Sequence, residues 1–393
     1  MNATLEKIKT HPLLGKLQAN PYLGRLFRPG PIRTFSGFLA GGILLFLVAP
    51  VVLSQFRLEL LGKYLAFAIV ASGIGLAWGR GGLLTLGQGV FFGIGAYAMA
   101  MHLKLSQTPE GQLPDFMQLY GEVEKLPGYW VPFQYAWFAI PAIVIFPALI
   151  AYLLGAMIFR RGVRGAYFAI LSQALAAALA IFIVGQQGTT GGTNGLTNLN
   201  NFFGYDLDDP VNRKMVYFII AGILLGVIAI TRQLMFSRYG ELLVATRDAY
   251  QRVRFLGYNP ARVLTVAFAV SAAMAGLGGA AFVSIVGAIN PASIDVVPSI
   301  AFIIGVAVGG RSTLLGPVLG AVGVAWFGTA ASEAYPDSWQ YIQGGMFILV
   351  VAFLPGGLAT LPAAFRAIKG KWDDRKPPEI PSMGSGAIQE ASA

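Results

Sequence analysis

The sequence contains no cysteine and only two histidines, His11 and His102, among its 393 residues. The missing thiols exclude disulfide bonds, thiolate zinc sites, iron–sulfur clusters and a cysteine nucleophile. Two histidines that are so far apart in the sequence also leave no histidine cluster for a metal ion. Paired carboxylates and Ser–His–Asp arrangements near the apolar segments are missing as well. We therefore predict a chain that is not an enzyme and that holds no metal and no cofactor of its own.

Charge is scarce too, because charged residues make up 12% of the chain, whereas hydrophobic residues make up 55% and the mean hydropathy is +0.64. Soluble domains carry about 25% charged residues. A helix that crosses a membrane needs about 20 apolar residues, and the sequence contains about ten such segments. It therefore predicts an all-α, polytopic membrane protein with about ten transmembrane helices. Their approximate bounds are 36–53, 62–79, 83–103, 134–158, 166–185, 215–234, 262–286, 297–311, 314–332 and 340–362. The eighth segment is short, which leaves open whether it is tilted, partial or re-entrant.

The positive residues are distributed unevenly between the connecting segments. With a cytoplasmic N-terminus, most of the 28 lysines and arginines fall on the cytoplasmic side. The opposite side then holds only Arg57, Lys63, Lys104, Lys125, Arg213 and Lys214. Because cytoplasmic loops carry the excess of Lys and Arg, we predict that both termini are cytoplasmic. The net charge of +10 then reflects topology and contact with membrane lipid, and we expect no nucleic-acid partner.

These bounds divide the chain into three parts. Residues 1–35 form a cytoplasmic N-terminal segment, and residues 36–364 form the transmembrane domain. Residues 365–393 form a cytoplasmic tail, and its low hydrophobicity predicts disorder.

The sequence also lacks the residues and motifs with which transporters use a proton gradient or ATP. In the predicted spans, no Asp, Glu, Lys or Arg lies well inside the membrane, and no G-x-x-x-x-G-K-[ST] phosphate-binding loop occurs anywhere. Proton-coupled carriers usually place ionisable groups inside the membrane, and most transport ATPases need the phosphate-binding loop. The chain is therefore either a passive channel or a permease that another protein drives.

Uncharged polar residues remain in two of the segments. Thr85 and Gln88 lie in a glycine-rich third segment, and Ser172 and Gln173 lie in the fifth. Glycines allow close helix packing or a helix break that lines a passage. For each glutamine, an interhelical hydrogen bond and a pathway-lining role are both consistent with the sequence. A passage of amides, hydroxyls and aromatic rings suits a small neutral or zwitterionic solute. The candidate pathway residues are Thr85, Gln88, Phe92, Tyr167, Ser172 and Gln173.

One charged stretch, SRYGELLVATRDAYQRVRFLGYNPARV (237–263), stands between apolar segments. It has no Pro or Gly between Glu241 and Leu256, which predicts a short helix at about 241–256. Ser237 or Gly240 could begin this helix, and Gly257 with the Asn–Pro pair that follows would end it. An apolar stripe is predicted along one side. The stripe consists of Leu242, Ala245, Ala249, Val253 and Leu256.

Such an amphipathic helix at the cytoplasmic interface could bind anionic lipid or dock onto a protein. A lipid anchor needs neither the Arg247–Asp248 pair nor the sharp end at Gly257. These two features favour protein docking.

The run ELLVATRDAYQRVRFLGYNPARV resembles the cytoplasmic loop of membrane subunits of ABC importers in the branched-chain amino acid class. Other stretches resemble the same family, and together they cover about residues 60–360. They are GRGGLLTLGQGVFFGIGAYAMAMHL, RGVRGAYFAILSQALAAAL, GGTNGLTN, AFAVSAAMAGLGGAAFV, INPASIDVVPSI and VAVGGRSTLLGPVLGA. The resemblance implies that the short helix couples the chain to an ATPase. The implied coupling residues are Arg238, Glu241, Arg247, Asp248, Arg252 and Gly257.

The resemblance also implies partners and a location. The chain would be a permease subunit in the bacterial inner or plasma membrane. It would pair with a second related permease subunit, two cytoplasmic ATP-binding subunits and an extracytoplasmic solute-binding protein. ATP would be bound by the partner subunits and not by this chain.

Several motifs, LGQGVFFGIGAYAMAM, YFAILSQALA, NGLTN, RFLGY and INPAS, are similar to the second membrane subunit of urea importers. They imply urea as the solute. Gln88 and Ala301 depart from that pattern, which has a histidine and an acidic residue there. Branched-chain amino acids or short amides are the alternative solutes. A stand-alone passive channel is the alternative of a different class.

Overall fold

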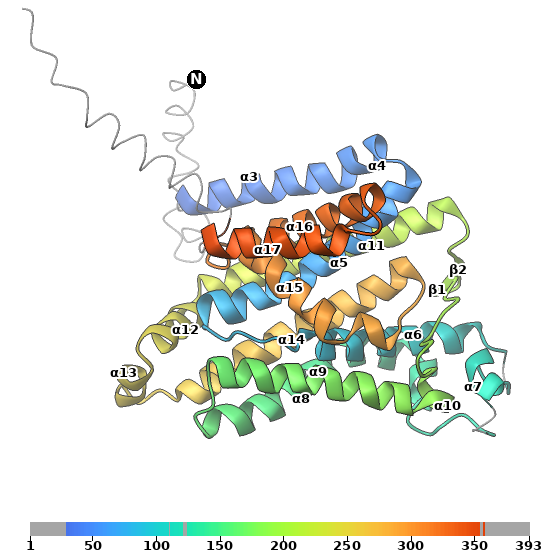
Figure 1. Cartoon of the computed structure of the whole chain (residues 1–393), viewed down its shortest axis with the longest axis horizontal. Helices are drawn as coiled ribbons and strands as arrows, with labels where there is room; N and C mark the ends of the chain where they lie inside the picture. Colours follow the sequence, from blue (N-terminus) through green and yellow to red (C-terminus); the bar gives the residue numbers. More distant parts are fainter. Residues whose placement is uncertain (1–28, 110, 121–123, 354–356, 358–393) are drawn as a thin grey trace, which may run out of the picture.

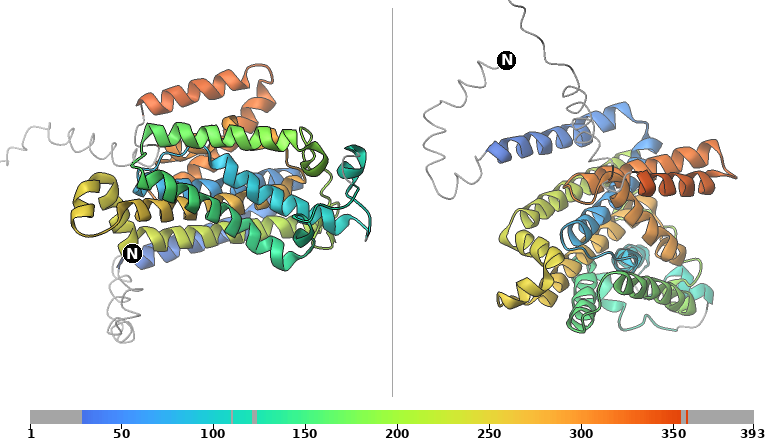
Figure 2. Two further views of the ribbon diagram at one scale, coloured as in Figure 1. Left: turned by 90° about the horizontal axis from the view of Figure 1, so that it is seen from below. Right: turned by 60° about the vertical axis from the view of Figure 1, so that its left-hand side comes forward.

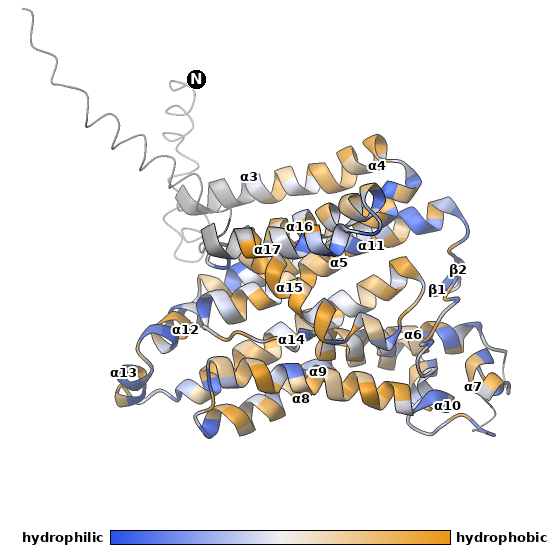
Figure 3. Cartoon of the chain, viewed as in Figure 1, coloured by the Kyte–Doolittle hydropathy of each residue, from blue (hydrophilic) through white to orange (hydrophobic). Residues whose placement is uncertain are grey.

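The computed structural model describes residues 29–353, apart from 110 and 121–123, together with Gly357. Its long helices run back and forth along one axis of the molecule and pack side by side (Figures 1 and 2). Apolar residues cover the middle of these helices, and hydrophilic residues gather at the two ends (Figure 3). This arrangement confirms the predicted all-α membrane fold. The predicted tail, 365–393, and residues 1–28 of the predicted N-terminal segment lie outside the described residues.

The long helical passages are α3–η1–α4 (Pro29–Ile43, Leu44–Val48, Ala49–Val52), α5–η2 (Gln55–Ile74, Gly75–Arg80), α6 (Gln88–Gln107), α8 (Ala136–Arg160), α9 (Ala166–Gly185), α11 (Pro210–Met235), α14 (Pro260–Val286), α15 (Val296–Gly309), α16 (Gly316–Ala334) and α17 (Trp339–Phe353). Each predicted segment overlaps one of these passages, and the end of the tenth, after Phe353, lies outside the described residues apart from Gly357. Six stretches of the described chain are long and apolar enough on their own to cross a membrane. They are Gln55–Arg80, Ala136–Arg160, Ala166–Gly185, Pro210–Met235, Pro260–Val286 and Pro291–Gly309.

Short elements connect the long helices at the two ends of the molecule. One end carries α12 (Arg238–Asp248) and α13 (Tyr250–Phe255), which the charge distribution assigns to the cytoplasm. The opposite end carries α7 (Asp115–Tyr120), η3 (Val131–Gln134), α10 (Gln187–Thr190) and the hairpin of β1 (Asn201–Phe202) and β2 (Tyr205–Asp206). We call the first the coupling end and the second the outer end (Figure 1). The short helix η4 (Pro291–Ser293) precedes α15 and contacts α6 and α9.

The core is built around α14, which packs against α5, α6 and α8. Small residues make this possible, because they let helix backbones approach closely. A Cβ atom on Gly95 would lie 2.2 Å from the carbonyl oxygen of Gly276, and one on Gly279 would lie 2.0 Å from that of Phe92. At both glycines the backbones of α6 and α14 are in direct contact, with no room for a side chain between them.

The third segment begins later than the sequence predicts, because residues 81–87 are not helical and α6 starts at Gln88. Gly82 opens this break with φ +69°, a conformation that favours glycine. The break then runs against α9, where a Cβ on Gly87 would lie 1.8 Å from the carbonyl oxygen of Ser172. The backbone N–H of Leu86 donates to the Ser172 hydroxyl at 3.0 Å. Hydropathy does not detect such a break, since its residues are as apolar as those of a helix.

The short eighth segment also begins inside the bundle. The N–H of Gly89, in the first turn of α6, donates to the Ser299 hydroxyl in the first turn of α15 at 3.0 Å. Gln88 in turn contacts Ser271, near the middle of α14. Two helices therefore start beside each other deep in the molecule, one running toward the outer end and the other toward the coupling end (Figure 1).

Lys63 is the residue that bears on the expectation that no charged residue lies well inside a span. The hydropathy places the start of the second segment at 62, but α5 begins at Gln55 after the cap residue Ser54. Lys63 therefore lies about two turns inside the helix. Lys104 also lies within a helix, α6, where its ammonium binds an Asp115 carboxylate oxygen at 2.8 Å and a main-chain carbonyl at 3.1 Å.

Candidate coupling and translocation site

The predicted helix at 241–256 is two helices, because the chain bends at Ala249 (φ −143°, ψ 57°). Of the two predicted starts, the Ser237 hydroxyl caps α12, which begins at Arg238, three residues before the predicted bound. The second helix ends at Phe255, Gly257 follows with φ +86°, and the Asn259 side chain caps α14. The predicted apolar stripe is wrong, because Ala245 and Leu256 are exposed. The bend rotates the two helices relative to each other, and the buried residues of α12 are Gly240, Leu243 and Thr246.

The buried face of α12 rests on the membrane domain. The fully buried side chain of Leu243 lies against Gly81, at the start of the break between α5 and α6. The Tyr239 hydroxyl donates to the carbonyl of Val263 in α14 at 2.8 Å, and burial raises the pKa of Tyr239 above its usual range. These contacts tie α12 to both α14 and the break.

Arg247 links α12 to the end of α5. Its Nη1 donates to the main-chain carbonyl of Gly79 at 2.7 Å, and its aliphatic stem covers Gly82. Two further bonds reach Asp248, from Nε at 2.7 Å and from Nη2 at 3.1 Å. The paired hydrogen bonds raise the pKa of Arg247 and lower that of Asp248, so both groups are charged at neutral pH. Arg247 therefore contacts the membrane domain while its side chain is still 38% exposed.

The outward surface of the coupling end carries the other predicted coupling residues. Arg238, Glu241 and Arg252 are exposed, as is Gly257. The sequence analysis missed the large apolar side chains beside them. Phe255 is 89% exposed, Leu256 75% and Tyr258 56%. The FLGY run, which follows four arginines, could have indicated this apolar surface in the sequence. It was missed because a single continuous helix would place Leu256 on the buried side.

Three of the candidate pathway residues lie together at the break. Thr85 and Gln88 are fully buried, and Ser172 is 6% exposed. The Gln88 amide nitrogen donates to the Ser271 hydroxyl at 2.9 Å, so the interhelical hydrogen bond exists. However, Gln88 Oε1 and the Thr85 hydroxyl have no hydrogen-bond partner among the described residues. Buried polar atoms without partners are costly, which marks this place as suited to a polar occupant.

The remaining candidates lie elsewhere. Phe92, one turn after Gln88, lies in a cluster of phenyl rings and lines a cavity of about 540 Å³ toward the outer end. Gln173 is half-buried on α9. Tyr167 is 79% exposed near the coupling end of α9, and the structure does not bring it to the others.

Together, these contacts connect α12 to the break at 81–87. The coupling helix α12 holds Gly79 in the π-helical turn η2 through Arg247, and the break follows directly. π-Helical turns are frequent at functional sites. A displacement of α12 would therefore act on the segment that carries Thr85 and Gln88. Among the described residues, no group of three His, Asp or Glu side chains could hold a metal ion.

Comparison with known proteins agrees with this architecture. Residues 56–351 match the family described as "Branched-chain amino acid transport system / permease component". Two relatives are each called "High-affinity branched-chain amino acid transport system permease protein LivM", one from Escherichia coli (strain K12) and one from Salmonella typhimurium (strain LT2). Each is 26% identical to this chain over 349 residues, which cover 82% of this chain and 74% of the relative. No solved structure matches. The chain belongs to this family, and it is a non-catalytic, integral inner-membrane permease subunit of an ABC importer with separate ATP-binding and substrate-binding partners.

Proposed function

We propose that this subunit moves a branched-chain amino acid or a solute of similar size through the membrane, using ATP that partner subunits hydrolyse. The observation that carries the proposal is the connection from the surface of α12–α13 through Arg247 to the break at 81–87. A passive channel would have no use for such a connection. The match to two LivM relatives supports the solute class.

The assembly that fits this function has several members. Exposed Phe255, Leu256 and Tyr258, flanked by arginines, form a surface suited to a cytoplasmic ATP-binding subunit. Buried aromatic and arginine anchors dominate many protein interfaces. We propose two such ATP-binding subunits, a second related permease subunit and an extracytoplasmic solute-binding protein.

Urea is the second candidate solute. The motifs around Gln88 and the INPAS stretch favour it, because they are similar to those of urea importers. The buried amide and hydroxyl oxygens of Gln88 and Thr85 could accept hydrogen bonds from a neutral amide. The structure gives urea no further support over an amino acid, and the relatives favour the amino acid.

Reconstitution into liposomes tests the proposal. The complete complex should accumulate labelled leucine only when ATP and the loaded solute-binding protein are both present. This chain reconstituted alone should give no leucine flux. Flux through the chain alone, independent of ATP, would indicate a channel and overturn the importer mechanism. Stronger inhibition of leucine uptake by urea than by isoleucine would overturn the solute class.

A further inference from the structure

The cavity of about 540 Å³ at the outer half of the molecule lies between α5, α15, α16 and α17. Its volume is within the range of sites for small molecules, about 300–1,000 Å³. The lining combines one cation, several uncharged polar groups and phenyl rings. It includes Lys63, Phe67, Phe92, Phe302, Thr329 and Ser332.

Lys63 is the unusual member of this lining. It is half-buried inside α5, and it makes no ion pair or hydrogen bond with any residue that the structure describes. Lysine inside a membrane span is costly and rare, and it usually faces a water-filled cavity or a substrate route. No carboxylate of the described chain pairs with its charge, so the cavity offers an anionic group a free cation.

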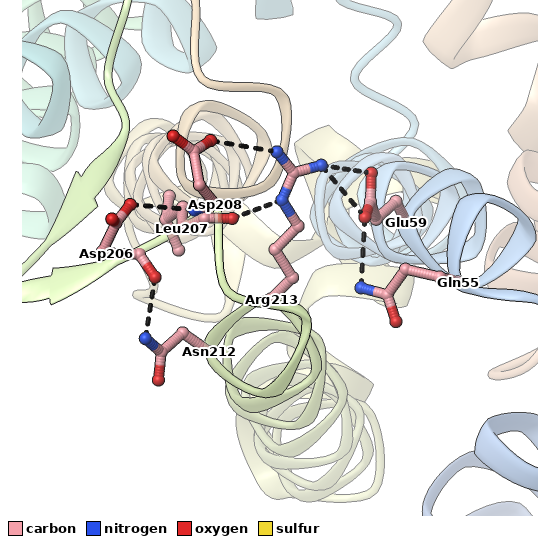
Figure 4. A network of polar contacts seen from close by, with 7 residues as sticks. All are labelled: Gln55, Glu59, Asp206, Leu207, Asp208, Asn212 and Arg213. Carbon is pink, nitrogen blue, oxygen red and sulfur yellow. Dashed lines mark hydrogen bonds and ion pairs between the residues drawn. The ribbon is translucent and has the colours of Figure 1, made fainter.

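A simpler explanation would pair Lys63 with Glu59, one turn earlier on the same helix, as Glu–Lys pairs at this spacing commonly do. The structure does not contain this pairing, and Glu59 is bound to other residues. Both of its carboxylate oxygens accept from Arg213 Nη1, at 3.2 and 3.1 Å, and one also accepts from Gln55. In Figure 4, the Glu59 carboxylate points to Arg213, which also reaches Asp208 and the carbonyl of Leu207.

The second nearby carboxylate is bound as well. Glu333, at the outer end of α16, accepts two hydrogen bonds from Arg57 at 3.2 and 3.0 Å. This pair joins the outer ends of α5 and α16. At a rise of about 1.5 Å per residue, Lys63 lies about 9 Å below Arg57, and Thr329 lies about 6 Å below Glu333. Lys63 and Thr329 are therefore at similar depth on two neighbouring walls of the cavity.

The remaining walls provide two other kinds of contact. The Ser332 and Thr329 hydroxyls donate to main-chain carbonyls at 2.9 and 3.1 Å, which leaves their oxygens as acceptors. Part of the cavity wall is a cluster of Phe67, Phe92 and Phe302, whose ring centroids lie 5.4–6.4 Å apart. Such a wall favours an aliphatic group over a polar one.

We propose that this cavity binds an aliphatic α-amino acid as a zwitterion on its way to the break at Gln88. The Lys63 ammonium pairs with the carboxylate of the ligand. The oxygens of Thr329 and Ser332 accept from its ammonium group, and the phenyl rings hold its side chain. Urea has neither a carboxylate nor an aliphatic group, so it would gain little here. The inference rests on the proposed amino acid transport and names residues that would carry it.

Binding of labelled leucine to the purified complex in detergent, without the solute-binding protein, tests the site. We expect saturable binding that falls at least about tenfold in affinity in Lys63→Met and stays within about threefold in Lys63→Arg. Leucinamide, which lacks the carboxylate, should compete at least about tenfold more weakly than leucine. Lys214→Met, which removes an exposed cation of α11 outside the cavity, should bind like the wild type.

ATP-dependent leucine uptake and the thermal midpoint are measured on the same preparations. They separate loss of the site from loss of folding. Equal leucine affinity in the wild type and Lys63→Met would overturn the inference, and Lys63 would then be a lysine that reaches the membrane surface along its helix. Absence of saturable binding by a wild-type complex that still transports leucine would overturn the site but leave the proposed function standing.

Discussion

Arg247 Nη1 donates a hydrogen bond to the carbonyl oxygen of Gly79 at 2.7 Å. These two residues are far apart in the sequence, and they belong to the coupling helix α12 and to the last turn of η2 before the break. A Cβ on Gly79 would lie 1.8 Å from the carbonyl oxygen of Arg311, so the turn is held from a second side. The contact makes α12 part of the membrane domain and not a detached docking arm.

Arg247→Gln should uncouple ATP hydrolysis from transport. The change removes the charged hydrogen bond to Gly79, and such bonds contribute about 1.5–3 kcal/mol. We expect leucine uptake to fall about tenfold, while the ATP-binding subunits still co-purify. The control is Arg160→Gln, at an exposed arginine of α8. Equal uptake by Arg247→Gln and the wild type would show that the contact carries no movement.

The Arg247–Asp248 pair should contribute a small, acid-sensitive stabilisation. The hydrogen bonds from Arg247 lower the pKa of Asp248, so the contribution is present above the unfolded-state value of about 3.9 and is lost as the pH falls through the lowered pKa. The difference in thermal midpoint between the wild type and Asp248→Asn should therefore be constant from about pH 8 to pH 5 and then shrink. A difference that changes near neutral pH would contradict this assignment.

Gly87→Ala should destabilise the domain, because its Cβ would overlap the carbonyl oxygen of Ser172. Overpacking of this kind costs about 1–3 kcal/mol. The matched control is Gly226→Ala in α11, where nothing lies within 4 Å of the new Cβ. We expect a lower thermal midpoint for Gly87→Ala only. Equal midpoints would mean that the break is not held against α9.

The pair Phe255→Ala/Leu256→Ala should weaken attachment of the ATP-binding subunits. These side chains are 89% and 75% exposed at the coupling end, and interface anchors of this kind contribute about 2 kcal/mol or more. We expect about thirtyfold weaker binding. Val51→Ala/Val52→Ala, an exposed apolar pair on α4, is the control. Unchanged co-purification would instead make α13 a lipid contact.

The sequence predicted the helical passages and the ends of the coupling element because those features are local. Apolar length sets each span, and Ser237, Gly257 and Asn259 set the boundaries by backbone chemistry. The glycines of the third segment left close packing and a helix break both open, and the structure has the break. Its position at 81–87 was not predictable in the same way, since it depends on contacts with Ser172 and Leu243. These partners are distant in the sequence.

The environment of Lys63 in the proposed binding cavity also could not be predicted from the sequence. Its position in the sequence, one turn after Glu59, suggests a local ion pair. Only the packing of α11 against α5 brings Arg213 to Glu59 and leaves Lys63 beside the cavity. The grouping of Thr85, Gln88 and Ser172 was foreseen from their uncharged polar character. The exposure of Tyr167 was not, because one sequence does not show which face of α9 points inward.

The most direct test of the account uses the absence of cysteine, because Thr85→Cys then supplies the only thiol of the chain. In the complete complex, its reaction with a water-soluble thiol reagent is followed on this chain by mass spectrometry. In this structure the residue is fully buried, and we expect slow modification in the absence of ATP. ATP with loaded solute-binding protein should accelerate it at least about tenfold, and Arg247→Gln should remove that acceleration. The same slow rate with and without ATP would contradict the claim that ATP hydrolysis opens the break to the solute.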